Sequence, residues 1–238
     1  MKSTRNVNIL LVHGAWADGA SWSGVIRLLQ ARGLRVIAVP IPLTSLEDDV
    51  AALHSTLERT EGPVVLAAHA YAGAVISGAK HQRVQALCFI AALTPDEGET
   101  VADVFYREPP HPQAPKLAPD SHGFIWLPDE SFAAAFAQNA PGEQVGVLAA
   151  TQRPIAVPCI QQRASRAAWK TLPSWYLIAE EDRMINPATQ RFLARRMGAQ
   201  ERSAKVDHTP SVTAPDLVTE VVLEAVTSVS EAGHERAV

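Results

Sequence analysis

Nearly continuous hydrophobic runs recur along this chain, at intervals that leave room for a helix between them. Five of these runs span residues 8–14, 34–41, 63–70, 84–93 and 173–182, and a more polar sixth run spans 201–208. Strands of a parallel sheet are covered on both faces, so they lack the alternation of hydrophobic and polar residues that half-exposed strands show. The pattern therefore predicts about six strands, five of them buried on both faces.

The segments between these runs have the lengths and end signals of helices. We expect helices over residues 21–33, 45–59, 186–198 and 214–230. Thr44 and Glu47 have the spacing of a capping box at the start of the second helix. Asn186 suits the N-cap of the third helix, and Gly198 suits the position just past its end. Strands and helices that alternate in this way predict an α/β protein with a doubly wound, mostly parallel sheet and helices on both faces.

The alternation stops between residues 93 and 173, where the chain is rich in proline and aromatic residues. A stretch of this length inside a compact domain is usually functional rather than a plain connection. We expect a single α/β domain over residues 1–238 with a helical cap inserted at about 95–165. The cap would contain short helices, one of them over 131–139, and would lie over the carboxyl ends of the strands.

Composition and charge exclude several classes of protein. Hydrophobic residues make up 47% of the chain and charged residues 19%, as in an ordinary globular protein. The net charge of −4 and the scattered Lys and Arg residues argue against a nucleic-acid partner, which requires a basic surface. No apolar run reaches the roughly 20 residues that span a bilayer, so we expect no membrane partner.

The two ends of the chain and the cysteines add three expectations. The segment 1–14 lacks the apolar region and cleavage site of a signal peptide, which predicts a cytoplasmic protein, and the tail 230–238 is expected to fray. Cys88 and Cys159 lie in apolar surroundings without a CxxC motif, which favours buried reduced thiols over a disulfide or a metal site. No G-x-G-x-x-G or GK[ST] loop is present, so we expect no organic cofactor.

Polar residues follow four of the predicted strands. They read HGAW at 13–16, HAYAG at 69–73, EEDR at 180–183 and DHTP at 207–210. Ligands of open α/β sheets bind outside the carboxyl ends of the strands. These four turns are therefore the first candidates for a functional site.

One of these turns carries a family resemblance. Residues 13–22 read HGAWADGASW, one letter from the HGAWADGSSW-like stretch that opens many bacterial esterases. The chain resembles the α/β-hydrolases, and among them the small subgroup that joins these esterases to plant methyl esterases and hydroxynitrile lyases. The resemblance covers almost the whole chain and weakens in the cap and the tail. It implies a G-x-S-x-G nucleophile elbow and a triad in the order Ser, Asp or Glu, His.

By this resemblance, residues 68–72 form the elbow, with Ala70 at the nucleophile position. Asp182 is then the acid and His208 the base, and the backbone N–H groups of Ala15 and Tyr71 form the oxyanion hole. The outer glycines of the elbow are alanines here, and their small size suits the close packing of helix and strand. The serious departure is Ala70 itself, because alanine has no atom that can attack a carbonyl carbon.

Several other residues compete for these roles. The rivals of Asp182 as the acid are Glu180, Glu181 and Asp96, the last because some hydrolase subfamilies place the acid after the fourth strand. Three serines away from the elbow apex could be imagined as substitute nucleophiles, and we discount them: Ser21, Ser77 and Ser211. His13 lies at a turn where its ring can simply bond to the backbone.

Three hypotheses explain Ala70. In the leading one, the native protein has serine at this position, the chain is a deliberate serine-to-alanine variant, and the underlying activity is hydrolysis of a carboxylic ester or lactone through an acyl-enzyme. In the second, a natural enzyme uses His208 and Asp182 as a general base without a nucleophile, as in hydroxynitrile-lyase-like or cofactor-free chemistry. In the third, the chain is a non-catalytic pseudoenzyme that binds a small molecule.

The substrate is less readable from the sequence. Trp16, His69 and Trp126 are candidate substrate-binding residues, although core filling is equally open for the two tryptophans and a structural role is favoured for His69. The cap offers aromatic surface and no cluster of Arg or Lys that would bind a carboxylate or phosphate. We therefore expect an uncharged, moderately apolar ester as the small-molecule partner. Cap surfaces of this family often meet a partner subunit, which leaves a homodimer open.

Overall fold

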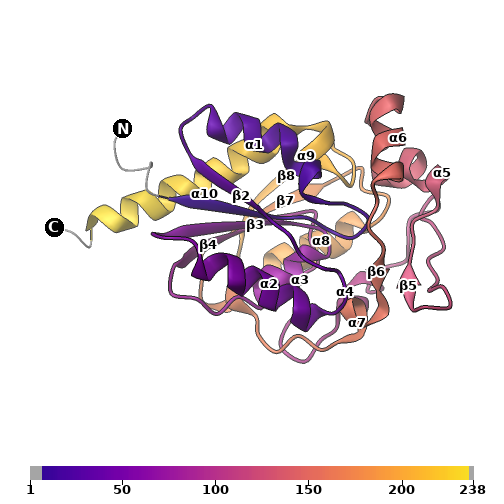
Figure 1. Cartoon of the computed structure of the whole chain (residues 1–238), viewed down its shortest axis with the longest axis horizontal. Coiled ribbons are helices and arrows are strands. Elements are labelled where there is room, and N and C mark those ends of the chain that lie inside the picture. Colours follow the sequence, from indigo (N-terminus) through magenta and orange to yellow (C-terminus); the bar gives the residue numbers. More distant parts are fainter. Residues whose placement is uncertain (1–6, 236–238) are drawn as a thin grey trace.

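A six-stranded parallel sheet forms the centre of the molecule in the computed structural model, which describes residues 7–235 (Figure 1). The strands are β1 (Asn8–Val12), β2 (Arg35–Val39), β3 (Val64–His69), β4 (Val84–Ile90), β7 (Ser174–Ala179) and β8 (Gln200–Ala204). Their order across the sheet is β2-β1-β3-β4-β7-β8, and each neighbouring pair is parallel. This arrangement confirms the predicted doubly wound fold.

The position of a strand in the sheet explains most of the sequences, but the prediction of five strands buried on both faces is wrong for β2, an apolar edge strand in which only Val39 is buried. In β1, β3 and β7 every residue is buried, because these strands have a neighbour on each side and helices over both faces. In β8, by contrast, no residue is buried. This strand lies at the edge of the sheet, where charged residues such as Glu201 and Arg202 hinder pairing with another chain. The polar sixth run of the sequence is therefore an edge strand.

Helices cover both faces of the sheet. The helices α1 (Ser23–Gln30), preceded by the 3-10 turn η2 (Gly19–Trp22), and α10 (Pro215–Glu235) lie on one face, and α2 (Leu46–Glu58), α3 (Ala72–Ser77) and α8 (Pro187–Arg196) lie on the other (Figure 1). Alternate residues of β1 divide between the two cores: Ile9 packs with the first set of helices and Leu10 with the second. Both side chains are fully buried.

The helix ends follow the predicted signals with one correction. The side chain of Asn186 accepts a hydrogen bond from the Ala188 N–H at the start of α8, and Gly198 follows the helix with a φ of 63°, as expected. The N-cap of α2 is Ser45 and not Thr44, because Ser45 is the extended residue whose hydroxyl accepts from the Asp48 N–H. The Thr44 hydroxyl instead donates to the carboxylate of Asp48.

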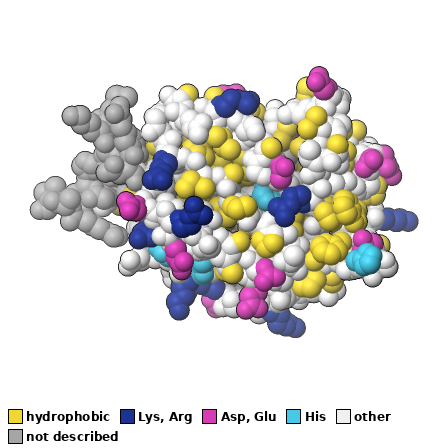
Figure 2. All heavy atoms as spheres, in the orientation of Figure 1, with side chains coloured by type: hydrophobic (Ala, Val, Ile, Leu, Met, Phe, Trp, Pro, Cys, Tyr) yellow, Lys and Arg dark blue, Asp and Glu magenta, His cyan; other side chains and the backbone are white. Residues whose placement is uncertain are grey.

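Between β4 and β7 the chain leaves the sheet and covers the carboxyl ends of the strands, at the right of Figure 1. The elements of this segment are α4 (Val101–Phe105), β5 (Phe124–Ile125), α5 (Asp129–Ser131), the π-helical turn η3 (Phe132–Phe136), α6 (Gly142–Ala150), β6 (Ile155–Ala156), α7 (Val157–Gln161) and the 3-10 turn η4 (Ala168–Lys170). Residues 95–165 are called the cap below. Figure 2 shows hydrophobic side chains gathered on the visible face near β6 and α7.

The short helix expected over 131–139 is a π-helical turn. The N–H of Ala137 donates to the carbonyl oxygen of Phe132, five residues earlier, as this kind of turn requires. A turn of this kind inserts an extra residue into a helix and is frequent at functional sites. Its rings of Phe132 and Phe136 are fully buried, 5.1 Å apart between centroids.

Within residues 7–235, no helix is long and apolar enough to cross a membrane. The tail that was expected to fray is helical as far as Glu235. The segment on which the expectation of a cytoplasmic protein rests begins with residues 1–6, which lie outside the described residues, as do residues 236–238.

Candidate active site

The side chains of Asp182 and His208 meet at the carboxyl ends of β7 and β8. The Nδ1 atom of His208 lies 2.9 Å from Oδ2 of Asp182, and both side chains are buried. The other carboxylate oxygen of Asp182 accepts hydrogen bonds from the N–H groups of Met184 and Ile185, each at 2.8 Å. The carboxylate is thus fixed by its own loop and can orient the imidazole and stabilise its protonated form.

Two of the three rivals of Asp182 are engaged elsewhere, and the side chain of the third, Glu181, is exposed. The carboxylate of Glu180 forms an ion pair with Arg191 at 2.5 Å, and the hydrogen bond from Arg191 lowers the pKa of Glu180 below its ordinary value. Asp96 pairs with Lys170 at 2.5 Å. Of the proposed acids, only Asp182 contacts the imidazole of His208.

The turn between β3 and α3 has the geometry of a nucleophile elbow. Ala70 stands at its apex with a φ of 50°, a conformation that residues with a side chain rarely adopt. The carbonyl oxygen of Ala70 accepts from the N–H groups of Gly73 and Leu93, which closes the turn. A Cβ atom on Gly73 would lie 2.5 Å from the carbonyl oxygen of Leu93, so only glycine fits there.

The turn after β1 packs directly against this elbow. A Cβ atom on Gly14 would lie 3.1 Å from the Cβ atom of Ala70. Within residues 7–235, the N–H groups of Ala15 and Tyr71 donate to no protein acceptor. Trp16, with a φ of 57°, donates its backbone N–H to Arg153 and its ring N–H to Ile125 in the cap. The two unpaired N–H groups flank Ala70, as the donors of an oxyanion hole must flank a nucleophile.

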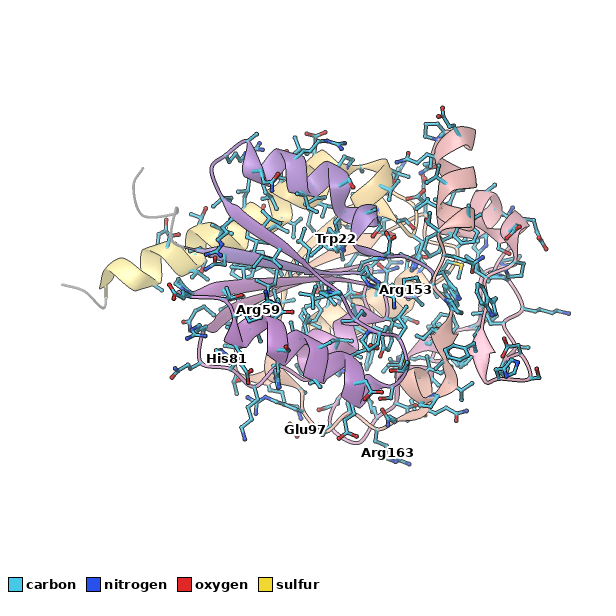
Figure 3. The ribbon with its side chains drawn as sticks, in the orientation of Figure 1. Trp22, Arg59, His81, Glu97, Arg153 and Arg163 are labelled. Atoms are coloured by element: carbon cyan, nitrogen blue, oxygen red, sulfur yellow. The ribbon has the colours of Figure 1, made fainter. Side chains whose placement is uncertain are left out.

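The residue that holds the cap against this turn is Arg153. Its guanidinium donates to the carbonyl oxygens of Ile41 at 2.8 Å and Pro42 at 3.2 Å, while its own carbonyl oxygen accepts from Trp16. Figure 3 places the Arg153 side chain where the ends of the strands meet the cap. The cap is therefore anchored beside the candidate oxyanion turn.

A cavity lies between these turns and the cap. The space between its walls amounts to about 670 Å³, a volume that includes the part open to solvent at its mouth. Ala70, Tyr71 and His208 line it from the strand ends, and the cap contributes mostly apolar side chains, among them Val101, Phe105, Leu117, Ile125 and Ile160. Among the described residues, no Lys, Arg, Asp or Glu side chain lines the cavity. Charged ligands would lose their hydration here without gaining a partner.

The structure corrects two of the three expected substrate contacts. Trp16 lines the cavity, as expected, but Trp126 and His69 do not. The Trp126 side chain is half exposed and donates its ring N–H to Asp120, because it lies on the outer side of the cap. His69 is buried beneath the site, where its Nε2 atom lies 2.7 Å from the carbonyl oxygen of His208. Burial lowers the pKa of His69 to about 3, so the ring is neutral and donates a proton to that oxygen.

The remaining histidine, cysteine and serine candidates do not line the cavity. His13 bonds the carbonyl oxygen of Gly14 through Nδ1. Cys88 and Cys159 are buried and unpaired, and burial raises the pKa of both thiols. None of the three discounted serines lines the cavity: Ser21, Ser77 and Ser211. No cluster of three or more metal-ligating side chains occurs within the part of the chain that the structure describes.

Sequence reasoning missed Gln190, a fully buried residue of α8. Its side-chain amide donates to Oδ2 of Asp182 at 2.8 Å and to the carbonyl oxygen of Ile185, and its amide oxygen accepts from the Ala179 N–H. Gln190 thereby ties β7 to the loop of the acid. A single glutamine in an amphipathic helix carries no motif, so only the folded contacts reveal it.

The comparisons with known proteins agree with one another. The sequence profile of the Alpha/beta hydrolase family matches residues 9–221. The Alpha/beta hydrolase nvfD of Aspergillus novofumigatus is 24% identical over 243 residues, which cover 91% of this chain and 95% of that protein. The Pyrethroid hydrolase of Sphingobium wenxiniae is 25% identical over 244 residues, which cover 91% of this chain and 86% of that protein.

Solved structures are also similar. The crystal structure of polyneuridine aldehyde esterase superposes with a TM-score of 0.79, at 17% sequence identity, and the match covers 92% of this chain and 98% of that chain. At this identity the match concerns the fold alone.

Proposed function

Because this chain belongs to the alpha/beta hydrolase family, we propose that its cavity is the active site of a hydrolase for uncharged, apolar carboxylic esters or lactones. Residue 70 is the nucleophile position, Asp182 and His208 are the acid and the base, and the N–H groups of Ala15 and Tyr71 form the oxyanion hole. With alanine at position 70, the chain binds such an ester without hydrolysing it.

The reaction requires a serine in place of Ala70. The hydroxyl oxygen of that serine attacks the ester carbonyl carbon while Nε2 of His208 takes its proton. The negative oxygen that forms accepts from the N–H groups of Ala15 and Tyr71. The bond to the alcohol then breaks, and the alcohol leaves with the proton from His208. Water repeats the sequence on the acyl-enzyme and releases the acid.

The conformation of Ala70 is the observation that carries this proposal. A φ of 50° costs an alanine free energy, on the order of 1 kcal/mol, that the fold must recover elsewhere. The elbow is held in this form by the bonds to Gly73 and Leu93, whichever side chain stands at its apex. Alanine gains no contact from this constrained conformation. The same turn lies beside the fixed pair of Asp182 and His208 and two unpaired N–H groups. This arrangement supports the proposal that a serine hydroxyl belongs at position 70.

The substrate class follows from the cavity walls. Apolar side chains from the cap face the elbow, and no charged side chain of the described residues lines the space. A neutral ester loses little on leaving water for such a site, whereas a carboxylate or phosphate ester would be rejected. One relative is named a pyrethroid hydrolase, which supports hydrolysis as the class of reaction.

The experiment restores the missing atom. We expect Ala70→Ser to hydrolyse p-nitrophenyl esters of acetate, butyrate and hexanoate, while the parent chain and the double variant Ala70→Ser/His208→Ala stay inactive. Removal of the nucleophile or base from a working triad costs on the order of 10⁶ in kcat, so the contrast is large. The reading fails if Ala70→Ser is as inactive as the parent although it binds the same esters in a thermal-shift assay.

A second candidate follows from the free side of His208. Its Nε2 atom has no protein partner within residues 7–235, and His208 lines the cavity, so the ring could remove a proton directly from an acidic substrate. This function predicts that the parent chain is active and that Ala70→Ser brings no gain. If the parent and Ala70→Ser both bind the ester and neither turns it over, the result would instead fit a non-catalytic receptor.

A further inference from the structure

The residue before His208 is a buried carboxylate that the proposed chemistry does not use. Asp207 is fully buried and forms no ion pair among the described residues. Its Oδ1 atom accepts from the Thr209 N–H at 3.2 Å and the Thr213 hydroxyl at 2.6 Å, both in its own turn. Its Oδ2 atom reaches the cap and accepts from the Asn139 N–H at 3.0 Å. One oxygen therefore serves the turn, and the other joins the turn to the cap.

The residue after His208 makes a second link to the same cap segment. The hydroxyl of Thr209, a fully buried residue, donates to the carbonyl oxygen of Phe136 at 2.6 Å. The Phe136 ring packs against the His208 ring, with 5.3 Å between the centroids. His208 is thus flanked by two bonds to the cap, one to the last residue of the π-helical turn and one to Asn139 just beyond it.

The cap segment 132–139 also contacts the loop of the acid. The side chain of Gln138 donates to the carbonyl oxygen of Glu181 at 2.7 Å, and the guanidinium of Arg183 donates to the carbonyl oxygen of Ala134 at 2.7 Å. Glu181 and Arg183 are the neighbours of Asp182. The same eight residues of the cap therefore hold the loops of both the acid and the base, which come from different strands.

From this geometry we propose that Asp207 and Thr209 are positioning residues, which hold the His208 imidazole against Asp182 through their hydrogen bonds to cap segment 132–139. This inference rests on the proposed function of His208 as a base. The cap then does more than enclose substrate, because it sets the distance between the acid and the base. A general base displaced by about 1 Å loses about 100-fold in rate, so a small slackening of these bonds has a large effect.

The chain offers a matched set of variants. In Asp207→Asn the amide oxygen keeps the two donors of the turn, and the amide nitrogen faces the Asn139 N–H, so only the link to the cap is lost. Thr209→Val removes the bond to Phe136 at nearly constant volume. The control is Thr213→Val, which removes a hydroxyl from the same carboxylate but breaks no bond to the cap.

The first readout needs no turnover and uses the parent chain with Ala70. We expect the Nδ1 proton of His208 to give a low-field NMR resonance in the parent and in Thr213→Val. In Asp207→Asn and Thr209→Val we expect its exchange with water to accelerate at least about tenfold, because the ring leaves Asp182 more often. Circular dichroism verifies that each variant is folded. If Asp207→Asn does not fold, Thr209→Val by itself still tests the proposal.

The second readout places the same variants in the Ala70→Ser background. We expect kcat to fall about 10- to 100-fold in Asp207→Asn and Thr209→Val with KM changed less than about threefold, and Thr213→Val to stay within about twofold of its background. A rise in KM at unchanged kcat would overturn the proposal, because the cap would then only enclose substrate. An unchanged exchange rate of the His208 Nδ1 proton in both variants would also overturn the proposal. If Ala70→Ser proves inactive, the proposed function fails. The NMR readout still tests whether Asp207 and Thr209 hold the His208 imidazole against Asp182.

Discussion

The two sides of the cavity are built by different means. On the side of residue 70, small residues pack so closely that Gly73 and Gly14 have little or no room for a Cβ atom. On the side of His208, the loops that carry His208 and Asp182 are held by hydrogen bonds from Gln190, Asn139 and Gln138. The packed side keeps its shape without a serine hydroxyl, because no bond of the elbow depends on that hydroxyl. The hydrogen-bonded side, around His208 and Asp182, should be disturbed less by added side-chain volume than by the loss of one hydrogen-bond partner.

The largest expected effect is a loss of activity on the hydrogen-bonded side. In the Ala70→Ser background, Asp182→Asn keeps the volume of the acid but removes the charge that holds the imidazole. We expect kcat to fall by roughly 10⁴ with little change in folding stability. Steady-state kinetics with p-nitrophenyl butyrate measures the fall, and urea unfolding measures the stability. A loss of less than tenfold would mean that His208 does not depend on Asp182.

Gln190→Leu sharpens the same side of the comparison. The variant removes the amide that donates to Oδ2 of Asp182, so the carboxylate gains freedom to turn away from His208. We expect a fall in kcat of about 10- to 100-fold in the Ala70→Ser background, smaller than that of Asp182→Asn. The conservative variant Gln190→Glu keeps the volume and loses the donor, so it should fall equally, and an activity close to its background would contradict the role.

Added volume tests the packed side. The extra methyl group of Gly73→Ala would lie 2.5 Å from the Leu93 carbonyl oxygen, so the backbone must move. We expect the free energy of unfolding to fall by about 1–3 kcal/mol in urea titrations. The matched control is Gly146→Ala in α6, where a Cβ atom meets nothing within 4 Å and stability should rise by about 0.5–1 kcal/mol. Equal changes in the free energy of unfolding of the two variants would show that close packing does not distinguish the side of residue 70.

The smallest expected effect concerns Asp49, a buried residue of α2 behind the packed side. Its carboxylate accepts from the hydroxyl of Tyr71 at 2.6 Å and from the Leu43 N–H at 2.7 Å. Burial raises the pKa of Asp49 above its ordinary value of 3.8. The folded state therefore holds this proton more tightly than the unfolded state, and stability is lost as the pH rises through the folded-state pKa.

Asp49→Asn has no carboxyl proton to lose. We expect the parent to lose stability relative to Asp49→Asn as the pH is raised from 3.8 upward, until the folded-state carboxyl is fully ionised. Urea unfolding of both chains across this range gives the difference. A difference that is constant with pH would show that the hydrogen bonds from Tyr71 and Leu43 offset burial, and one that grows in favour of the parent would show that they outweigh it.

Much of the fold, and the contact between His208 and Asp182, could be predicted from the sequence. Continuous hydrophobic runs are visible in the chain because strands such as β1 and β3 are covered on both faces. The turns after the strands were found because carboxyl ends of parallel strands meet at one edge, which brought His208 and Asp182 together as expected. Such predictions depend on local pattern, and local pattern is what a sequence displays.

Contacts between distant segments were not predictable in this way. Trp126 and Trp16 are both aromatic, yet one lies outside the cap and the other lines the cavity, because the path of the cap decides which side faces inward. The bonds from Asp207 to Asn139 and from Gln190 to Asp182 join elements whose packing no short motif encodes. The N-cap at Ser45 differed from the prediction for a smaller reason, since two adjacent hydroxyl residues could both have capped α2.

The most direct measurement asks whether residue 70 is a nucleophile position. A fluorophosphonate probe with a short alkyl chain would be incubated with the parent, with Ala70→Ser and with Ala70→Ser/His208→Ala, and the intact mass of each protein recorded. In this reaction the serine oxygen bonds to phosphorus, fluoride leaves, and His208 takes the proton. We predict one adduct per chain in Ala70→Ser, located at position 70, and none in the other two proteins within the same time. An adduct of equal yield in the parent, or no adduct in a folded Ala70→Ser chain, would contradict the assignment of this elbow.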